Sequence, residues 1–295
     1  MALVSSTSVR SVLKVTGRIG FVDYHLDNYH ADVYLRLLRG ELGALGFAVT
    51  GCTALEAAPS QAWARDNDVP WFDDVATLDA HVDHYVILAP SNPETHLPLC
   101  EQVLPRGKST YVDKTFAPDS PTAESIFALA DRHGVVIQTS SALRYTDVQK
   151  QVEEAGGMEH ILHMVAWGGG SSFGEYAIHP VELVISCMGA GVRRLQRWSD
   201  EPRSRLLLEW ADGRSAVIHV HTDGGTTPYA ASLTTAAATQ FVTVDSSAIF
   251  RDTARAFLQA FETGEANVPR AETLAVRRIL DAAGENRARY GFIEV

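Results

Sequence analysis

The sequence predicts a two-domain α/β protein, in which a Rossmann-type, doubly wound parallel sheet is followed by an α+β domain with a mainly antiparallel open sheet. Three observations predict this fold. The chain has 295 residues and 46% hydrophobic content, which is more than one typical core holds. Short β-branched runs alternate with helical stretches over residues 12–142. From residue 143 to 295 the predicted strands are longer, and apolar and polar residues alternate along them.

The first domain follows a tail, residues 1–11, that has no structural pattern. Strand-like runs lie at 14–22, 47–53, 84–90, 109–115 and 135–140. We expect the run 84–90 to be the fourth strand of the sheet. Helical stretches lie between them at 31–46, 59–67, 96–107 and 120–134. Parallel strands with right-handed crossovers bind ligands beyond their carboxyl ends, so we expect the functional residues at that edge.

The second domain is predicted from strands at 159–169, 204–213, 214–224 and 230–245. Turn residues such as Ala211-Asp212-Gly213 separate them, which favours antiparallel pairing. Helices are expected at 180–188, 252–263 and 270–289. This domain is expected to carry substrate-binding and oligomer contacts.

Composition excludes several classes of function. The formal net charge of -11 disfavours binding to nucleic acid and to anionic membrane surfaces. No run of 18 apolar residues and no signal-peptide pattern is present, so no membrane span is expected. The three cysteines are odd in number and set in apolar sequence, which predicts reduced thiols and a cytoplasmic protein.

The first strand-to-helix turn lacks the glycines of a dinucleotide site. Asp23 and His25 stand where the first two glycines of G-x-G-x-x-G would be, and the turn reads Asp23-Tyr24-His25-Leu26. A carboxylate repels a pyrophosphate, and side chains crowd its approach. The second strand also ends at Thr53 without the acidic residue that usually binds the ribose of NAD. Both features disfavour ordinary dinucleotide binding.

The turn also gathers carboxylates and imidazoles, at Asp23, His25, Asp27 and His30. These are common ligands of metal sites without thiolates. The four residues straddle a strand and a helix, however, and such residues are common on solvated loops. We therefore expect no metal site, and a structural role for His30.

Three further motifs carry the functional prediction. Val86-Ile87-Leu88-Ala89-Pro90-Ser91-Asn92-Pro93-Glu94-Thr95-His96 follows a buried strand. Gly107-Lys108-Ser109-Thr110-Tyr111-Val112-Asp113-Lys114-Thr115 is similar to the pattern G-K-H-V-x-x-E-K-P, and Glu175-Tyr176-Ala177-Ile178-His179 is similar to D-x-x-x-H. In their order and spacing, the three motifs resemble the Gfo/Idh/MocA oxidoreductase family.

The resemblance implies an NAD(P)-dependent transfer of a hydride to or from a hydroxyl carbon of a sugar, cyclitol or related polyol. Lys114 and His179 would lie at the reacting oxygen, and Glu175 would hold the second nitrogen of His179. A neutral imidazole at a helix N-terminus can accept a hydroxyl proton, and an ammonium group can stabilise an alkoxide.

The resemblance and the turn also imply two sets of binding residues. The cofactor set is Asp23, Tyr24, His25, Leu26, Thr53, Ala89, Pro90, Ser91, Asn92, His96, Asp113 and Lys114. The substrate set is Arg144, Tyr145, Trp167 and Phe173.

Two alternatives to a redox enzyme remain. The same fold could serve a lyase, isomerase or hydrolase that uses Lys114 and His179 as acid and base, or a ligand-binding protein. In both, NAD or NADP would be absent. In every case we expect a small-molecule ligand and a homo-oligomer, a dimer or a tetramer, because the family commonly buries the open sheet face between subunits.

Overall fold

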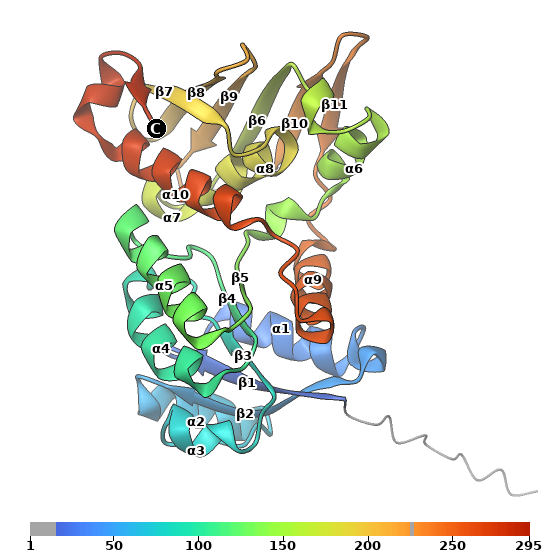
Figure 1. Cartoon of the computed structure of the whole chain (residues 1–295), viewed down its shortest axis with the longest axis vertical. Coiled ribbons are helices and arrows are strands. Elements are labelled where there is room, and N and C mark those ends of the chain that lie inside the picture. Colours follow the sequence, from blue (N-terminus) through green and yellow to red (C-terminus); the bar gives the residue numbers. More distant parts are fainter. Residues whose placement is uncertain (1–15, 225–226) are drawn as a thin grey trace, which may run out of the picture.

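The computed structural model describes residues 16–224 and 227–295. The predicted tail, residues 1–11, and the start of the first predicted strand lie outside these residues. Two sheets form separate layers of the molecule, with α5 and α10 packed against each other between them (Figure 1). The functional residues described below lie where the two layers meet.

The lower layer in Figure 1 is a five-stranded parallel sheet in the order β2-β1-β3-β4-β5. Its strands are β1 (Gly17–Asp23), β2 (Phe47–Ala54), β3 (His84–Ile87), β4 (Thr110–Val112) and β5 (Ile137–Gln138). The helices between them are α1 (Tyr29–Arg39), α2 (Ala57–Asp66), α3 (Val75–Asp79), α4 (His96–Val103) and α5 (Ser120–His133). One hydrophobic cluster joins the sheet to α1 and α2 and a second joins it to α3, α4 and α5, which confirms a doubly wound sheet.

One detail of the predicted order is wrong. The run expected as the fourth strand is β3, because the chain between β2 and β3 contributes only an isolated bridge from Cys52 to Trp71. Short single-turn helices complete this half of the chain, at η1 (Gly43–Leu45), η2 (Pro93–Thr95) and η3 (Leu104–Arg106).

The upper layer is a seven-stranded sheet in the order β11-β10-β6-β9-β8-β7-β12. Its strands are β6 (His163–Gly169), β7 (Val192–Trp198), β8 (Arg203–Trp210), β9 (Ser215–His221), β10 (Ala230–Thr234), β11 (Thr239–Thr243) and β12 (Ile293–Glu294). Only β6 and β9 pair in parallel, so the mainly antiparallel sheet is confirmed. The run expected as one strand at 230–245 is instead the hairpin β10–β11, and β7 and β12 were missed.

Helices cover one face of this sheet. They are α6 (Asp147–Glu154), α7 (Phe173–Tyr176), α8 (Ile178–Met188) and α10 (Arg270–Gly284), with single turns at η4 (Ala142–Arg144), η5 (Met158–His160) and η6 (Asn286–Arg289). The largest hydrophobic cluster lies between the sheet and these helices. The opposite face carries half-buried or exposed side chains such as Trp167, His219 and Phe241, and no helix of the described residues covers it.

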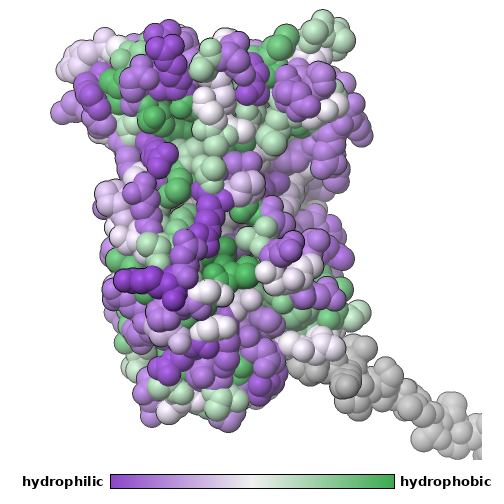
Figure 2. Space-filling view, viewed as in Figure 1, coloured by the Kyte–Doolittle hydropathy of each residue, from purple (hydrophilic) through white to green (hydrophobic). Residues whose placement is uncertain are grey.

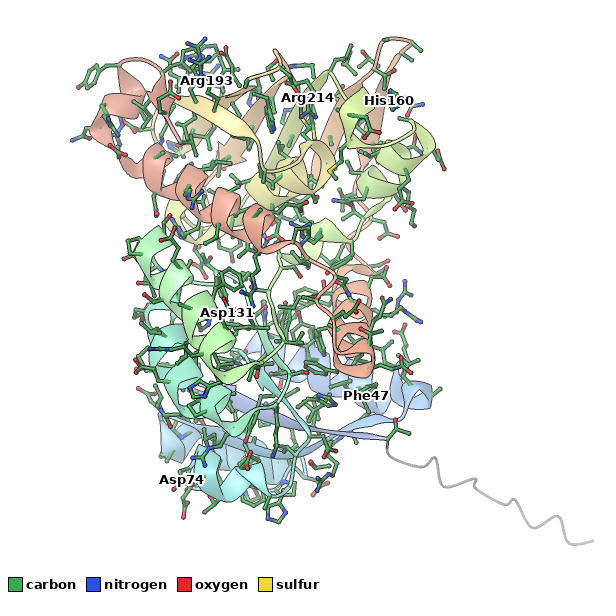
Figure 3. All side chains as sticks on the ribbon, viewed as in Figure 1. Phe47, Asp74, Asp131, His160, Arg193 and Arg214 are labelled. Atoms are coloured by element: carbon green, nitrogen blue, oxygen red, sulfur yellow. The ribbon has the colours of Figure 1, made fainter. Side chains whose placement is uncertain are left out.

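Helix α9 (Ile249–Thr263) crosses from the second half of the chain to the first sheet. Phe257 and Phe261 belong to the same hydrophobic cluster as α1, and Phe47 at the start of β2 lies beneath α9, 6.5 Å from Phe261 between ring centroids (Figure 3). The predicted domain boundary between residues 142 and 143 stays a prediction. Because α9 comes after this boundary but packs in the core of the first sheet, the two cores are not formed by separate stretches of the sequence.

The surface agrees with the acidic composition. On the face shown in Figure 2, hydrophilic residues dominate and hydrophobic residues form separate patches. Within the described residues, no helix is both long enough and apolar enough to cross a membrane. Cys52, Cys100 and Cys187 are all buried free thiols, as expected for reduced cysteines.

Candidate active site

A cavity of about 250 Å³ lies between the two layers, beyond the carboxyl ends of the parallel strands. Its wall is built by α1, by Lys114 two residues after β4, by η4, α7 and α8, by Tyr229 just before β10, and by the start of α9. The residues that line it are Tyr29, His30, Lys114, Ala142, Leu143, Tyr176, His179, Tyr229, Ile249 and Phe250. The structure therefore brings Lys114 and His179, 65 positions apart in the chain, into one pocket.

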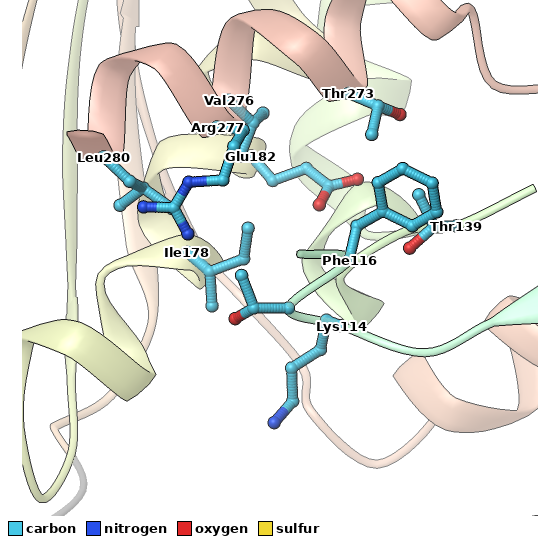
Figure 4. A pocket seen from close by; sticks show the side chains of 10 residues that line it. Lys114, Phe116, Thr139, Ile178, Glu182, Thr273, Val276, Arg277 and Leu280 are labelled. Carbon is cyan, nitrogen blue, oxygen red and sulfur yellow. The ribbon is translucent and has the colours of Figure 1, made fainter. Parts of the chain in front are cut away.

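Lys114 follows the end of β4, and only 8% of its surface is exposed. Its Nζ donates a hydrogen bond to the carbonyl oxygen of Pro90 at 3.1 Å, which ties it to the loop after β3. Figure 4 shows the ammonium group pointing away from a second, much smaller cavity between α8 and α10, which Ile178, Val276 and Leu280 line. The charge of Lys114 therefore belongs to the larger pocket.

His179 lies in the first turn of α8, as the sequence predicts for a helix N-terminus. Its Nδ1 forms a hydrogen bond with Oγ of Ser141 at 2.7 Å. Burial, together with the charges of Lys114 and His30, lowers the pKa of His179 to about 3. The imidazole is thus neutral, as expected, and burial is the main cause.

The predicted role of Glu175 as the partner of His179 is wrong. Glu175 lies on α7, and its Oε1 accepts a hydrogen bond from Ser91 Oγ at 2.8 Å, while Oε2 accepts one from Ser171 Oγ at 3.3 Å. The carboxylate turns toward these hydroxyls, and Ser141 fills the position beside His179. Glu175 instead links the upper layer to the loop after β3.

Asp113 and His30 form a buried contact that the sequence did not predict. Oδ2 of Asp113 contacts Nδ1 of His30, which projects from the first turn of α1. Asp113 is 1% exposed. Burial alone would raise its pKa, but the interactions with His30 and Lys114 prevail and lower it, so this carboxylate is ionised.

The turn after β1 is closed by its own side chains. Asp23 is buried, and its Oδ1 accepts hydrogen bonds from the backbone N–H groups of Tyr24 at 2.7 Å and Ala89 at 2.9 Å. Its Oδ2 accepts a hydrogen bond from Nδ2 of Asn28 at 2.9 Å. Burial raises the pKa of Asp23 to about 7, against the effect of these three donors.

The N-terminus of α1 is capped within the chain. Oδ1 of Asn28 accepts hydrogen bonds from the backbone N–H groups of His30 at 3.0 Å and Ala31 at 3.1 Å. The N–H of Leu26 donates to Ser60 Oγ at 3.1 Å. These are the amide groups that a phosphate-binding turn would offer to its ligand. The residues present therefore do not fit a pyrophosphate docked on α1.

Several predicted cofactor contacts are also wrong. Leu26 is fully buried in the core beneath α1. His96 is fully buried, with Nε2 2.9 Å from the carbonyl oxygen of Leu88 and Nδ1 3.1 Å from that of Phe116. Asp113 contacts His30 instead of facing an open groove. Their side chains serve the fold because burial removes them from any ligand.

The remaining predicted cofactor residues stay predictions. Ala89, Pro90, Ser91 and Asn92 form the loop between β3 and η2, and Pro90 contacts Lys114 as described above. Tyr24 donates a hydrogen bond from its hydroxyl to Oε1 of Glu56 at 2.6 Å, across the gap between the first two strand-to-helix turns. Thr53 is buried and His25 is half-buried in the same region.

None of the four predicted substrate residues lines the cavity. Arg144 is held by ion pairs with Glu182 at 2.8 Å and Glu272 at 2.6 Å, and Tyr145 reaches toward Asn267. Trp167 lies on the open sheet face, stacked on His219, because side chains alternate along β6. Phe173 is buried beneath the guanidinium of Arg197, 4.0 Å from the ring centroid. No contact in the structure supports these four substrate assignments, which stay predictions.

Sequence reasoning missed several residues of the pocket, namely His30, Ser141, Tyr176, Tyr229 and Phe250. Tyr176 lies within the motif that contains His179, so its position was readable in principle. Phe250 comes from α9, whose crossing to the first sheet left no signal in the sequence.

The fold and these motifs can be compared with known proteins. A family model described as the Gfo/Idh/MocA oxidoreductase family, NAD-binding Rossmann fold, matches residues 18–141. The N-terminal Rossmann domain belongs to the Gfo/Idh/MocA family. No curated protein matches the sequence of the chain.

Solved structures share the Gfo/Idh/MocA fold over both layers. GenD2 from gentamicin A biosynthesis, in complex with NAD, is 15% identical, with a TM-score of 0.80 over 100% of this chain and 99% of that chain. The myo-inositol 2-dehydrogenase of Lactobacillus plantarum is 13% identical, with a TM-score of 0.78 over 95% and 99%. The scyllo-inositol dehydrogenase of Lactobacillus casei, with bound NAD(H) and scyllo-inositol, is 12% identical, with a TM-score of 0.78 over 95% and 99%. At these identities the likeness shows the fold alone.

Proposed function

We propose that this chain is an oxidoreductase that acts at a hydroxyl-bearing carbon of a small polyol, such as a cyclitol or a sugar. The observation that carries the proposal is the meeting of Lys114 and His179 in one cavity between the two layers. At about 250 Å³ the cavity is smaller than pockets for drug-sized ligands, so the substrate is small. Tyr29, Tyr176 and Tyr229 give the wall aromatic surface with polar hydroxyls, which suits a polyol ring.

The residues of the chain have distinct tasks in this proposal. The ammonium group of Lys114 stabilises negative charge on the substrate oxygen. His179 stays neutral, so it adds no second positive charge and serves as a hydrogen-bond partner that Ser141 orients. Bound NAD or NADP would supply the hydride acceptor or donor.

A second candidate is a non-redox enzyme, a lyase, isomerase or hydrolase, that uses the same pocket. The specific observation in its favour is the closed turn, in which Asp23 and Asn28 occupy the N–H groups that a pyrophosphate would need. A ligand-binding protein without chemistry is not favoured by any observation of the pocket.

The test combines nucleotide binding with turnover. The purified protein is mixed with myo-inositol, scyllo-inositol and a set of aldoses, with NAD, with NADP or without nucleotide. Absorbance at the reduced nicotinamide band and NMR spectra of the sugars report the products. Nucleotide-dependent oxidation of a polyol supports the oxidoreductase, and conversion without nucleotide supports the second candidate. No conversion under either condition contradicts both.

The cytoplasmic location and the homo-oligomer stay predictions. The open face of the upper sheet is the surface that we propose for subunit contact, because the contacting rings of Trp167 and Phe241 leave aromatic surface on it. Sedimentation of only a 32.1 kDa species would contradict the oligomer.

A further inference from the structure

His30 lines the candidate pocket and has a buried carboxylate, that of Asp113, as its partner. It projects from the first turn of α1, lines the cavity, and keeps only 13% of its side-chain surface exposed. The carboxylate of Asp113 takes its Nδ1, so the nitrogen left for a ligand is Nε2. A buried carboxylate that holds one imidazole nitrogen orients the ring and stabilises its protonated form.

The closed turn is what places His30 there. Asn28 receives the N–H of His30 in its cap, and Asp23 fixes the amide group of Asn28. Edge-to-face contacts then hold the ring, with centroid distances of 5.1 Å to Phe250 of α9 and 6.1 Å to Tyr34 of α1. The network that removes a pyrophosphate site from α1 therefore positions an imidazole in the pocket instead.

We propose that His30, oriented by Asp113, is the general base that accepts the proton of the substrate hydroxyl in this pocket. The inference rests on the proposed function, since it names the base for chemistry at a hydroxyl carbon. The O–H bond breaks, the proton moves to Nε2 of His30, and the electron pair stays on the substrate oxygen beside the ammonium group of Lys114. The imidazolium that forms is paired with the carboxylate of Asp113.

His179 is the less suitable acceptor. Burial, together with the charges of Lys114 and His30, lowers its pKa to about 3, whereas an efficient base has a pKa near the working pH. Its Nδ1 is bonded to a neutral hydroxyl, Ser141, and not to a carboxylate. The titratable groups that face His30 are Asp113, Lys114, His179, Tyr29 and Tyr34.

The arrangement itself can be tested without a substrate. In NMR spectra of the full chain labelled with ¹⁵N-histidine, neutral His30 should carry its proton on Nδ1, and Asp113→Asn should remove that preference. Diethyl pyrocarbonate should then acylate His30 at Nε2, as mapped by mass spectrometry, with exposed His133 as the reference for intrinsic reactivity. A proton on Nε2, or a tautomer that Asp113→Asn leaves unchanged, would overturn the inference.

The catalytic role is tested with any polyol that the wild-type protein converts. His30→Gln should lower kcat by about 100-fold or more with a smaller change in KM, and His133→Gln should have no effect. Asp113→Asn should lower kcat and shift the pH profile, and Asp113→Glu should restore part of the activity. Full turnover by His30→Gln would contradict the role of His30 as general base, but not the proposed function. A wild-type protein that converts none of the compounds would contradict the proposed function. The tautomer measurement would then still show whether Asp113 orients His30.

Discussion

The buried carboxylate of Asp23 should give the protein an unusual dependence of stability on pH. Its pKa is raised from about 3.8 to about 7, chiefly by burial. In the window between these values the folded chain binds this proton more tightly than the unfolded chain does. Its contribution to stability is therefore fully present below about pH 4 and is lost as the pH rises through 7. A shift of about three units corresponds to roughly 4 kcal/mol.

The perturbation is Asp23→Asn, which removes the titration but keeps the shape of the side chain. Urea unfolding of both proteins between pH 4.5 and pH 8 gives the difference in unfolding free energy. We expect wild-type stability to fall, relative to Asp23→Asn, by about 3 kcal/mol across this window. Asp27→Asn, which changes an exposed carboxylate of the same turn, is the matched control. Parallel curves for wild type and Asp23→Asn would refute the reasoning.

Four other variants test separate parts of the structure. Lys114→Met should abolish turnover with an unchanged circular dichroism spectrum, and retained turnover would remove this residue from the mechanism. Arg144→Met should lower the unfolding free energy by about 3–5 kcal/mol, because it leaves two buried glutamates without their partner; a loss under 1 kcal/mol in urea titrations would contradict the buried network. Asn28→Ala should cost about 1 kcal/mol by loss of the α1 cap, measured in the same way. Trp167→Ala should leave kcat and KM unchanged, since its ring lies on the open sheet face, and a large change in either would place it at the site.

The fold was predictable because periodicity reports which side of an element is buried. Strand–helix alternation gave the parallel sheet, and the change of rhythm near residue 143 gave the second sheet. The hairpin β10–β11 was missed because the polar and small residues at 235–238 do not break the pattern of a strand. The crossing of α9 was missed because an amphipathic helix does not reveal which layer it covers.

The site was predictable only where a residue follows a strand or begins a helix. Lys114 and His179 met this condition, and both reach the pocket. Arg144 also met this condition, but its guanidinium group forms ion pairs with two glutamates from distant helices, Glu182 and Glu272. Sequence spacing cannot show such long-range pairing. The same limit hid the contact between His30 and Asp113, which lie 83 positions apart in the chain.

The closed turn also has a consequence for how any dinucleotide would be held. Affinity from the pyrophosphate and the adenosine should be small, because Asp23 and Asn28 already occupy the donors at α1. A nicotinamide cofactor would then depend on contacts at its other end, near Lys114 and the loop after β3 to which Lys114 donates a hydrogen bond.

Calorimetric titration of the full chain with ADP-ribose tests this most directly, because ADP-ribose contains the pyrophosphate and the adenosine without the nicotinamide. The closed turn predicts no saturable binding at millimolar concentrations. Binding in the micromolar range, competitive with NADH, would show that the turn opens to take a pyrophosphate and would contradict the account.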